Sequence, residues 1–345
     1  MNRPSISVCM PNYNHANYII EALESLIAQT VPPIEIIIID DASTDNSIDV
    51  IENYITRHRI VRLIKNFSNK GCYDSVNIAF AEAKGDYVYL MSADDKVLPG
   101  FFEKSVNLLE KYPAAGMCVN YPKDIDALSN PTKSMSFHSH ESDVNIRSPR
   151  FMSATEVLSR LSKQPWFLSG TVPVLFRRSA LSDIGCYIPG LELLTDWFTV
   201  HFVALKYGIC YIPEPLVAYR IMPNSVGIDV AAQPRVAIKY YARALRLMQE
   251  PRYRQVFPKS FIDKRRGRFT YSCFRGAFVL WQTNYLHELN SLVPPRTLFG
   301  RGILRLLQVL IKLQWLILRI YCHQNIPLVF REVAQIETEN TQREK

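Results

Sequence analysis

Short apolar runs alternate with amphipathic stretches over the first 120 residues. The runs are too short for helices and rich in β-branched residues, as in the four consecutive isoleucines of Glu35–Asp40, which predicts buried strands. The stretches between them repeat apolar residues at helical spacing, so strand and helix alternate as in a mainly parallel sheet with right-handed crossovers. We expect strands at Ile6–Met10, Glu35–Asp40, Val61–Lys65, Tyr87–Met91 and Gly116–Asn120, and helices at Tyr18–Gln29, Ser47–Arg57, Ser75–Ala83 and Phe101–Tyr112.

The pattern changes after Tyr121. Pro122–Pro149 is polar and without clear periodicity, which predicts a long connection or lid. Helices are expected near Ser153–Lys163 and Asp196–Lys206, a strand near Val172–Arg177, and a pair of strands around Cys210–Tyr219. From Val230 onward the pattern is helical, which divides the chain into an α/β region and a helical C-terminal region.

Paired carboxylates follow two of the predicted strands. Asp40–Asp41 ends one strand, and Asp94–Asp95 follows another in the stretch YVYLMSADDKVLPG. Ligands of such sheets bind beyond the carboxyl ends of the strands, and adjacent carboxylates repel each other unless a cation neutralises them. The pairs therefore indicate a Mg²⁺ or Mn²⁺ ion shared with a nucleotide diphosphate. The alternative is that these aspartates cap turns and helices.

Composition narrows the classes of protein. An apolar fraction of 48% and a charged fraction of 21% are typical of a globular chain and argue against disorder and a multi-span membrane protein. The seven scattered cysteines and the absence of a secretory leader pattern predict a cytoplasmic protein with reduced thiols. The sequence contains no dinucleotide, phosphate-loop or HExxH motif, and the HSHE stretch His138–Glu141 more simply belongs to a solvated loop than to a metal site.

Positive charge gathers in the C-terminal third. From Pro251 onward there are 16 Lys or Arg residues and 6 Asp or Glu residues. The stretch Arg301–His323 places basic residues on one stripe of an apolar helix, and Lys312 interrupts any membrane-spanning run. This pattern predicts a helix lying on an anionic membrane surface, although packing within the protein is an open alternative. Nucleic acid is not an expected partner because no binding motif accompanies the charge.

Three stretches together resemble the inverting family 2 glycosyltransferases of the GT-A fold. They are SVCMPNYNHANYIIEALESLIAQT, EIIIIDDASTDNS and YVYLMSADDKVLPG, in this order and spacing, and the resemblance covers roughly the first 225 residues. It implies an α/β GT-A fold with a C-terminal helical extension. Residues 1–122 would be the nucleotide-binding half, residues 123–228 the acceptor-binding half, and residues 229–345 a basic helical region.

The resemblance also implies roles for residues on the donor side. Pro11 and Tyr13 would line the base pocket, with Tyr13 stacking on the base, and Asp41 would accept a hydrogen bond from it, most simply from uracil. Asp94 would lie by the ribose and the metal, and Asp95 would bind the metal directly. Ser92 stands where the family often has another acidic residue.

Further roles follow from the second half of the resemblance. Asp196, in GLELLTDWFTVHFVALKYG, would be the general base, with Glu192 as the rival. In YRIMPNSVG, Met222 occupies the place of a frequent histidine, and Arg220 would meet the diphosphate or else form a structural ion pair. Trp166 lies on the acceptor side, either stacking on a sugar or packing in the core.

These roles imply a hexosyltransferase that uses a nucleotide-diphosphate sugar, most simply a UDP-sugar, with Mg²⁺ or Mn²⁺. The acceptor would be a hydroxyl of a lipid-linked or growing bacterial polysaccharide at the inner face of the cell membrane. Two alternatives stay open: a nucleotidyltransferase, which lacks the expected glycine-rich, lysine-bearing loop, and a non-catalytic protein that binds sugar nucleotides or membranes.

Overall fold

The computed structural model describes residues 4–132, 146–164, 167–168, 170–222, 234–266 and 268–269. The chain forms two compact units, Met1–Pro223 and Asn224–Lys345. The division between them is at residue 223, where the sequence pattern suggested 228. The expected basic helix of Arg301–His323, the HSHE stretch and Trp166 lie outside the described residues.

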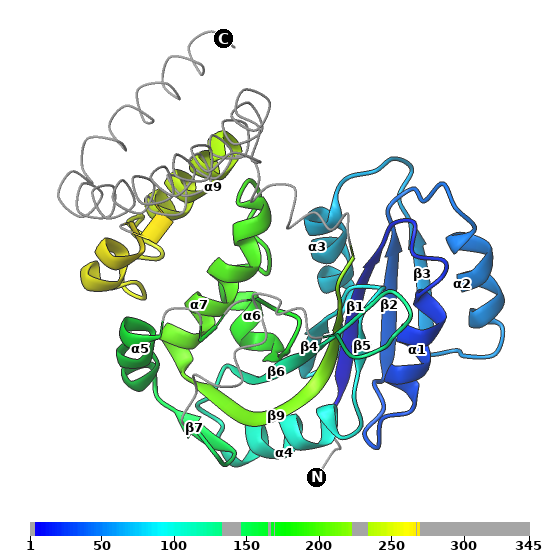
Figure 1. Ribbon diagram of the computed structural model, residues 1–345, viewed down its shortest axis with the longest axis horizontal. Coiled ribbons are helices and arrows are strands. Elements are labelled where there is room, and N and C mark those ends of the chain that lie inside the picture. Colours follow the sequence, from blue (N-terminus) through cyan, green and yellow to red (C-terminus); the bar gives the residue numbers. More distant parts are fainter. Residues whose placement is uncertain are drawn as a thin grey trace, which may run out of the picture. The chain divides into compact units, whose positions relative to one another are not determined.

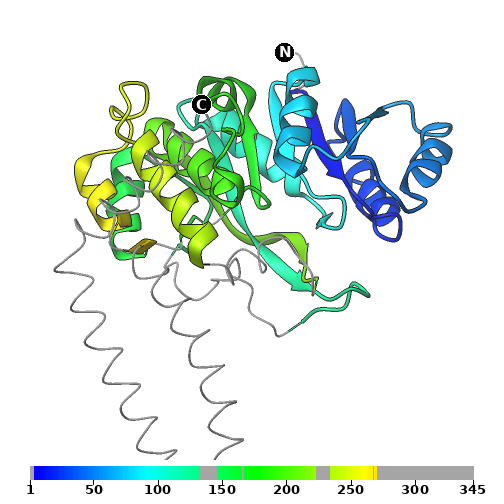
Figure 2. The ribbon, with the colours of Figure 1, turned by 90° about the horizontal axis from the view of Figure 1, so that it is seen from above.

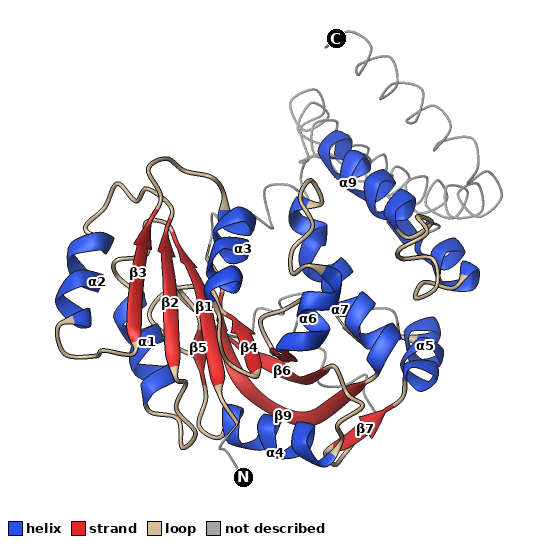
Figure 3. Cartoon of the chain, turned by 180° about the vertical axis from the view of Figure 1, so that it is seen from behind, coloured by secondary structure: helices blue, strands red, loops and turns tan. Residues whose placement is uncertain are grey.

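The first unit is built around a mixed sheet with the strand order β3-β2-β1-β4-β8-β6-β9-β5, and β7 pairs with β9 (Figure 3). Strands β1 to β4 are mutually parallel, as the alternating pattern predicted, whereas β8 is antiparallel to both β4 and β6. The strands are β1 (Ile6–Asn12), β2 (Glu35–Asp40), β3 (Val61–Lys65), β4 (Tyr87–Leu90), β5 (Lys96–Val97), β6 (Met117–Ile125), β7 (Arg150–Met152), β8 (Val174–Arg177) and β9 (Ile209–Arg220).

Helices connect these strands and cover both faces of the sheet (Figure 1). Right-handed crossovers place α1 and α2 on one face and α3, which returns from β3 to β4, on the other. The helices include α1 (Ile19–Ile27), α2 (Ser47–Ile55), α3 (Cys72–Glu82), α4 (Phe101–Lys111), α5 (Ala154–Lys163), α6 (Arg178–Ile184), the 3₁₀ turn η1 (Glu192–Leu194), α7 (Thr195–Tyr207) and α9 (Pro234–Leu247).

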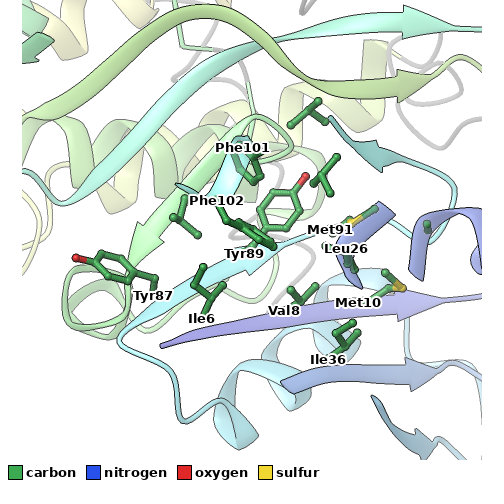
Figure 4. Close-up of a cluster of buried hydrophobic side chains, with 14 of the residues drawn as sticks. Ile6, Val8, Met10, Leu26, Ile36, Tyr87, Tyr89, Met91, Phe101 and Phe102 are labelled. Atoms are coloured by element: carbon green, nitrogen blue, oxygen red, sulfur yellow. The ribbon is translucent and has the colours of Figure 1, made fainter. Parts of the chain in front are cut away.

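Side-chain alternation along the strands forms the main core. Ile6, Val8 and Met10 of β1 point to one face, where they meet the buried side chains of α1 and α4 (Figure 4). Tyr89 of β4 packs edge-on against Phe101 at the start of α4, with ring centroids 4.9 Å apart. This burial fixes the register of the parallel strands, and with it the residues that emerge at their carboxyl ends.

Two expectations from the sequence need correction. The predicted strand pair around Cys210–Tyr219 is one continuous strand, β9, because Pro213 and Pro215 lie at an irregularity in its pairing with β6 and do not form a turn. The expected connection from Pro122 also begins later, since β6 continues to Ile125. The C-terminal half of β9 pairs with the short β5, which follows directly after Asp94–Asp95.

The described part of the second unit is mainly helical, with turns over residues 248–258 between α9 and the helical residues 259–266. Helix α9, yellow-green in Figures 1 and 2, agrees with the helical pattern predicted from Val230. Tyr241 stacks on Phe269 at 4.2 Å between ring centroids, and Phe257 and Phe261 are buried. None of the helices in the described part of the chain has the length and apolar character needed to cross a bilayer.

Candidate active site

Three carboxylates from separate elements lie close enough to the thiol of Cys72 to raise its pKa. Asp41 follows β2, Asp94 follows β4, and Asp196 lies in the first turn of α7. Cys72, at the start of α3, is exposed as a residue, whereas its thiol group is desolvated by the surrounding protein. This desolvation, together with the charges of Asp196, Asp41 and Asp94, raises the pKa of Cys72 to about 12. The predicted site residues of both halves therefore come together at the amino-terminal end of α3.

Asp41 is buried and holds the loop that leads into α3. Its Oδ1 accepts hydrogen bonds from Asn66 Nδ2 at 2.7 Å and from the amide of Lys70 at 2.8 Å, and its Oδ2 accepts one from the amide of Gly71 at 2.8 Å. A carboxylate offers about four acceptor positions, so Oδ2 keeps one for a ligand.

Asp40, the other member of this pair, has a structural role. Its Oδ1 accepts from the amide of Ser43 at 3.0 Å, and its Oδ2 accepts from Ser43 Oγ at 2.7 Å and Asn12 Nδ2 at 2.8 Å. These bonds join the loop after β2 to the end of β1. Since Asp40 is fully buried and internally satisfied, it matches the turn-forming alternative that the sequence left open.

Tyr13 and Pro11 lie beside this loop. Pro11 is opposite Ile39 in the parallel register of β1 and β2, and the amide of Asp41 donates to the carbonyl of Asn12 at 2.8 Å. Tyr13 is 44% exposed, an unusual position for a large aromatic ring.

Asp94 and Asp95 occupy a turn between β4 and β5. Ser92 Oγ donates to Asp94 Oδ1, so the serine that replaces an expected acidic residue orients its neighbour. Asp95 is 1% exposed, and its Oδ1 accepts from the amide of Arg220 at 2.9 Å. Burial and the charge of Asp94 raise the pKa of Asp95 well above its usual value.

The second oxygen of Asp95 provides a test of whether a metal fits. Asp95 Oδ2 is buried and has no hydrogen-bond partner among the described residues. An unsatisfied buried carboxylate oxygen is costly, and a divalent cation satisfies it. The described part of the chain offers no group of three or more metal-ligating side chains. The residues present therefore fit an ion that is held by one or two carboxylates and completed by substrate phosphates and water.

Arg220 is committed to contacts inside the protein. Its side chain is 1% exposed and forms an ion pair with Glu21 at 2.7 Å. Nε donates to the carbonyl of Asp94 at 2.7 Å, and Nη1 donates to the carbonyls of Asp126 at 2.9 Å and Ala127 at 3.1 Å. These contacts favour the structural ion pair over the diphosphate contact, the two roles that the sequence left open for Arg220.

Asp196 has the environment of a basic carboxylate. Burial raises its pKa above the ordinary aspartate value, while hydrogen bonds with the side chains of Tyr187 and Thr171 oppose that shift. Thr171 Oγ1 and Tyr187 Oη are themselves 2.8 Å apart. Glu192, the rival base, lies in η1 with a φ of +44° and is not among the charges acting on Cys72. Of these two candidates, Asp196 is the one whose charge acts on the same thiol as Asp41 and Asp94.

Sequence reasoning missed three residues around these carboxylates: Cys72, Thr171 and Tyr187. Tyr187 sits in a loop between α6 and η1, in the stretch GCYIPG, where its type and spacing resemble any turn residue. Gly185 and Gly190 at the ends of this stretch have φ values of +86° and +77°, so the two glycines are the local sequence signal that the chain turns there. Met222, partly buried after β9, occupies the position where the family often has histidine.

A sheet of this order, flanked by helices and with carboxylates at the ends of β2 and β4, defines a GT-A glycosyltransferase fold. Solved structures share it. The S. aureus protein TarS, residues 1–349 with UDP-GlcNAc, superposes with a TM-score of 0.61 over 95% of this chain and 92% of its own, at 17% identity. The mannosyltransferase PcManGT of Pyrobaculum calidifontis, with GDP-Man and Mn²⁺, gives 0.58 over 93% and 85%, at 16% identity. At these identities the likeness establishes the fold alone.

Residues 7–185, more than half of the chain, match Glycosyl transferase family 2, and the chain belongs to this family. Among its curated relatives, an uncharacterized glycosyltransferase of Haemophilus influenzae is 38% identical over 109 residues, which is 32% of this chain and 44% of the relative. Glycosyltransferase GlyG of Streptococcus pneumoniae is 32% identical over 116 residues, 34% of this chain and 38% of the relative. The matched regions span less than half the length of these two relatives.

Proposed function

We propose that this protein transfers a sugar from a nucleotide-diphosphate sugar, most simply a UDP-sugar, to an acceptor hydroxyl with inversion at the anomeric carbon. One observation carries the proposal: Asp41, Asp94 and Asp196 all act on the same thiol at the start of α3. Asp41 on the donor side, Asp94 on the metal side and the candidate base Asp196 therefore lie near one another. A transfer between two bound substrates requires such an arrangement.

The proposed reaction uses the carboxylates in different roles. Asp41 and Tyr13 bind the base of the donor, the first through its remaining acceptor position and the second by stacking. Asp196 takes the proton of the acceptor hydroxyl while that oxygen bonds to the anomeric carbon. The bond to the nucleoside diphosphate breaks on the opposite face, which inverts the configuration. Proton transfer of this kind contributes about 10²–10⁴-fold to a rate.

Asp95, with Asp94 beside it, would hold a Mg²⁺ or Mn²⁺ ion. Such an ion neutralises charge on the departing diphosphate. The chain's contribution is the buried, unpartnered Oδ2 of Asp95 and the turn that fixes it against Arg220. TarS with UDP-GlcNAc and PcManGT with GDP-Man and Mn²⁺ share this fold, which supports a nucleotide sugar and a metal as ligands here.

Donor hydrolysis in the presence of Mn²⁺ tests the proposal without a known acceptor. A thermal-shift panel of UDP- and GDP-sugars first selects the donor, because a ligand that binds the folded state raises the melting temperature. Asp95→Asn should then lower the Mn²⁺-dependent hydrolysis rate at least 100-fold, on the order of what a charge-stabilising group contributes. Asp49→Asn, on the exposed surface of α2, is the matched control. Equal rates in the two variants would reject the enzyme as described.

The acceptor side of the proposal is a lipid-linked or growing polysaccharide at the inner face of a bacterial membrane. It is supported by the excess of positive charge after Pro251 and by the basic stripe of Arg301–His323, which lies outside the described residues. The full chain should sediment with vesicles containing anionic lipid and not with neutral ones. Lys312→Glu should weaken that binding, and unchanged sedimentation would remove the membrane from the proposal.

A further inference from the structure

The environment of Asp196 contains a hydroxyl pair that the proposed reaction does not yet use. The side chains of Tyr187 and Thr171 both lower the pKa of the Asp196 carboxyl group, and their own hydroxyl oxygens are 2.8 Å apart. Tyr187 is 4% and Thr171 is 3% exposed, so water does not compete freely for these contacts. One of the two hydroxyls donates to the other, so the pair has one proton left to offer the Asp196 carboxylate.

The backbone at Tyr187 is itself fixed from α3. The side chain of Asn77 bonds to both polar groups of the Tyr187 backbone: Nδ2 donates to its carbonyl at 2.9 Å, and Oδ1 accepts from its amide at 2.9 Å. These reciprocal bonds join residues 110 positions apart. The loop that carries Tyr187 is therefore anchored to the same helix that begins at Cys72.

The loop is also anchored to the helix that carries Asp196. The amide of Ile188 donates to Thr195 Oγ1 at 3.0 Å, and Thr199 Oγ1 donates to the carbonyl of Cys186 at 3.0 Å. Cys186 has a φ of +61°, a strained conformation that such bonds hold in place. The position of the Tyr187 hydroxyl relative to Asp196 is thus set by α3 and α7 together.

We propose that Tyr187 is a positioning residue for the proposed base Asp196, with its hydroxyl aiming the carboxylate at the acceptor and Asn77 fixing the loop that presents it. Thr171 supports this hydroxyl, because its own Oγ1 lies within hydrogen-bond distance of it. The inference rests on the proposed function and deepens it, since it assigns the residues that set the geometry and basicity of the acceptor side.

The charge of Asp196 acts on four other titratable groups. They are Cys72 of α3, Cys186 and Tyr187 of the loop, and Tyr219 of β9. Burial raises the pKa of each, so all four are neutral at physiological pH. Tyr187 therefore remains a hydrogen-bond donor throughout the pH range in which Asp196 changes its charge.

The test is the pH profile of Tyr187→Phe, which removes one oxygen and keeps the ring. With UDP-GlcNAc, or the donor chosen by the panel, and Mn²⁺, kcat for donor hydrolysis should fall about tenfold, the effect of one lost hydrogen bond to a charged group. The acid limb of the kcat–pH profile should move to higher pH, because the hydroxyl no longer favours the charged carboxylate. KM for the donor should not change.

Controls separate this inference from the proposed function. Tyr73→Phe removes a hydroxyl from a ring packed edge-on against Tyr187, at 6.0 Å between centroids, and should leave the acid limb in place. Asp196→Asn should abolish the reaction; a normal rate would reject Asp196 as base and the proposed function with it. If Asp196→Asn is inactive but Tyr187→Phe keeps the wild-type profile, the positioning role alone is wrong. Thr171→Val, which should shift the limb in the same direction, replaces Tyr187→Phe if that variant does not fold.

Discussion

Replacing Arg220 with methionine should destabilise the first unit far more than its ion pair alone suggests. The substitution keeps an unbranched apolar stem and removes the guanidinium. Glu21 would lose one partner, but it is 40% exposed and retains Lys96 at 2.5 Å, so its charge stays partly compensated. The larger loss is at the carbonyls of Asp94 and Asp126, which Arg220 satisfies at 2.7 and 2.9 Å.

The expected magnitude follows from those acceptors. Leaving a buried acceptor unsatisfied costs about 1–3 kcal/mol, and water can reach some of the affected groups, so the total should be about 3 kcal/mol. The exposed pair Arg62–Glu82 provides the comparison. Its N–O distance is 2.8 Å, close to the 2.7 Å of Arg220–Glu21, but its side chains are 37% and 49% exposed. Arg62→Met should therefore cost less than about 1 kcal/mol.

Urea unfolding followed by hydrogen–deuterium exchange of peptides from β1 would measure both variants in the first unit itself. We expect the midpoint for Arg220→Met to fall well below that for Arg62→Met. Equal losses would show that burial of the guanidinium adds nothing to its ion pair, and the structural assignment of Arg220 would have to be withdrawn. The same variant should weaken Mn²⁺-dependent nucleotide binding, because the turn at Asp94 loses the bond from Nε.

Three further outcomes are expected. Gly85→Ala should lower the free energy of unfolding by about 1–3 kcal/mol in urea titrations, because the new Cβ would lie 2.6 Å from the backbone nitrogen of Ser7. Asp196→Asn should stabilise the protein at pH 7, measured as a higher melting temperature. The raised folded-state pKa of Asp196 means that its charged form opposes folding, and the gain should disappear below about pH 4, where both states are protonated. Cys72, although exposed, should react with iodoacetamide at pH 7.5 more than tenfold slower than free cysteine, because its pKa of about 12 leaves little thiolate.

Each of these outcomes has a contrary result. An unchanged unfolding midpoint for Gly85→Ala would mean that the backbone around Ser7 moves aside freely. A loss of stability in Asp196→Asn at pH 7 would mean that the hydrogen bonds to this carboxylate outweigh its burial. Peptide mapping by mass spectrometry isolates Cys72 from the other cysteines, and Asp196→Asn should speed its labelling by removing one nearby charge.

The parallel half of the fold could be predicted from the sequence because its signals are local. The isoleucine run of β2 and the strand Val61–Lys65 match the structure residue for residue. In β2 the cause is burial along its whole length, which leaves an uninterrupted apolar run. The continuous strand β9 was harder to predict from the sequence. Pro213 and Pro215 look like a turn in the sequence, and only pairing with β6 across an irregular register keeps the strand continuous.

The candidate site also contains residues that local sequence predicts and residues that it does not. Asp41, Asp94 and Asp95 follow strands, so their position at the sheet edge could be inferred from the chain alone. The internal partners of Arg220 and the hydroxyls on Asp196 come from loops whose approach depends on tertiary contacts. No local sequence pattern around Tyr187 indicates that the side chain of Asn77, 110 residues earlier, hydrogen-bonds to its backbone. The hydrophobic periodicity of the sequence therefore locates the carboxylates that follow strands. It does not locate the loop residues that change the pKa and orientation of these carboxylates.

The bond between Arg220 and Asp95 has a consequence for how the protein is made. The turn at Asp94–Asp95 is braced by a residue 125 positions later, at the end of β9. During synthesis the ribosome must therefore release the chain past residue 220 before that turn reaches its final shape. The first 120 residues, which carry the most recognisable motifs, therefore cannot complete this turn alone. A fragment that ends at residue 120 should not bind the nucleotide.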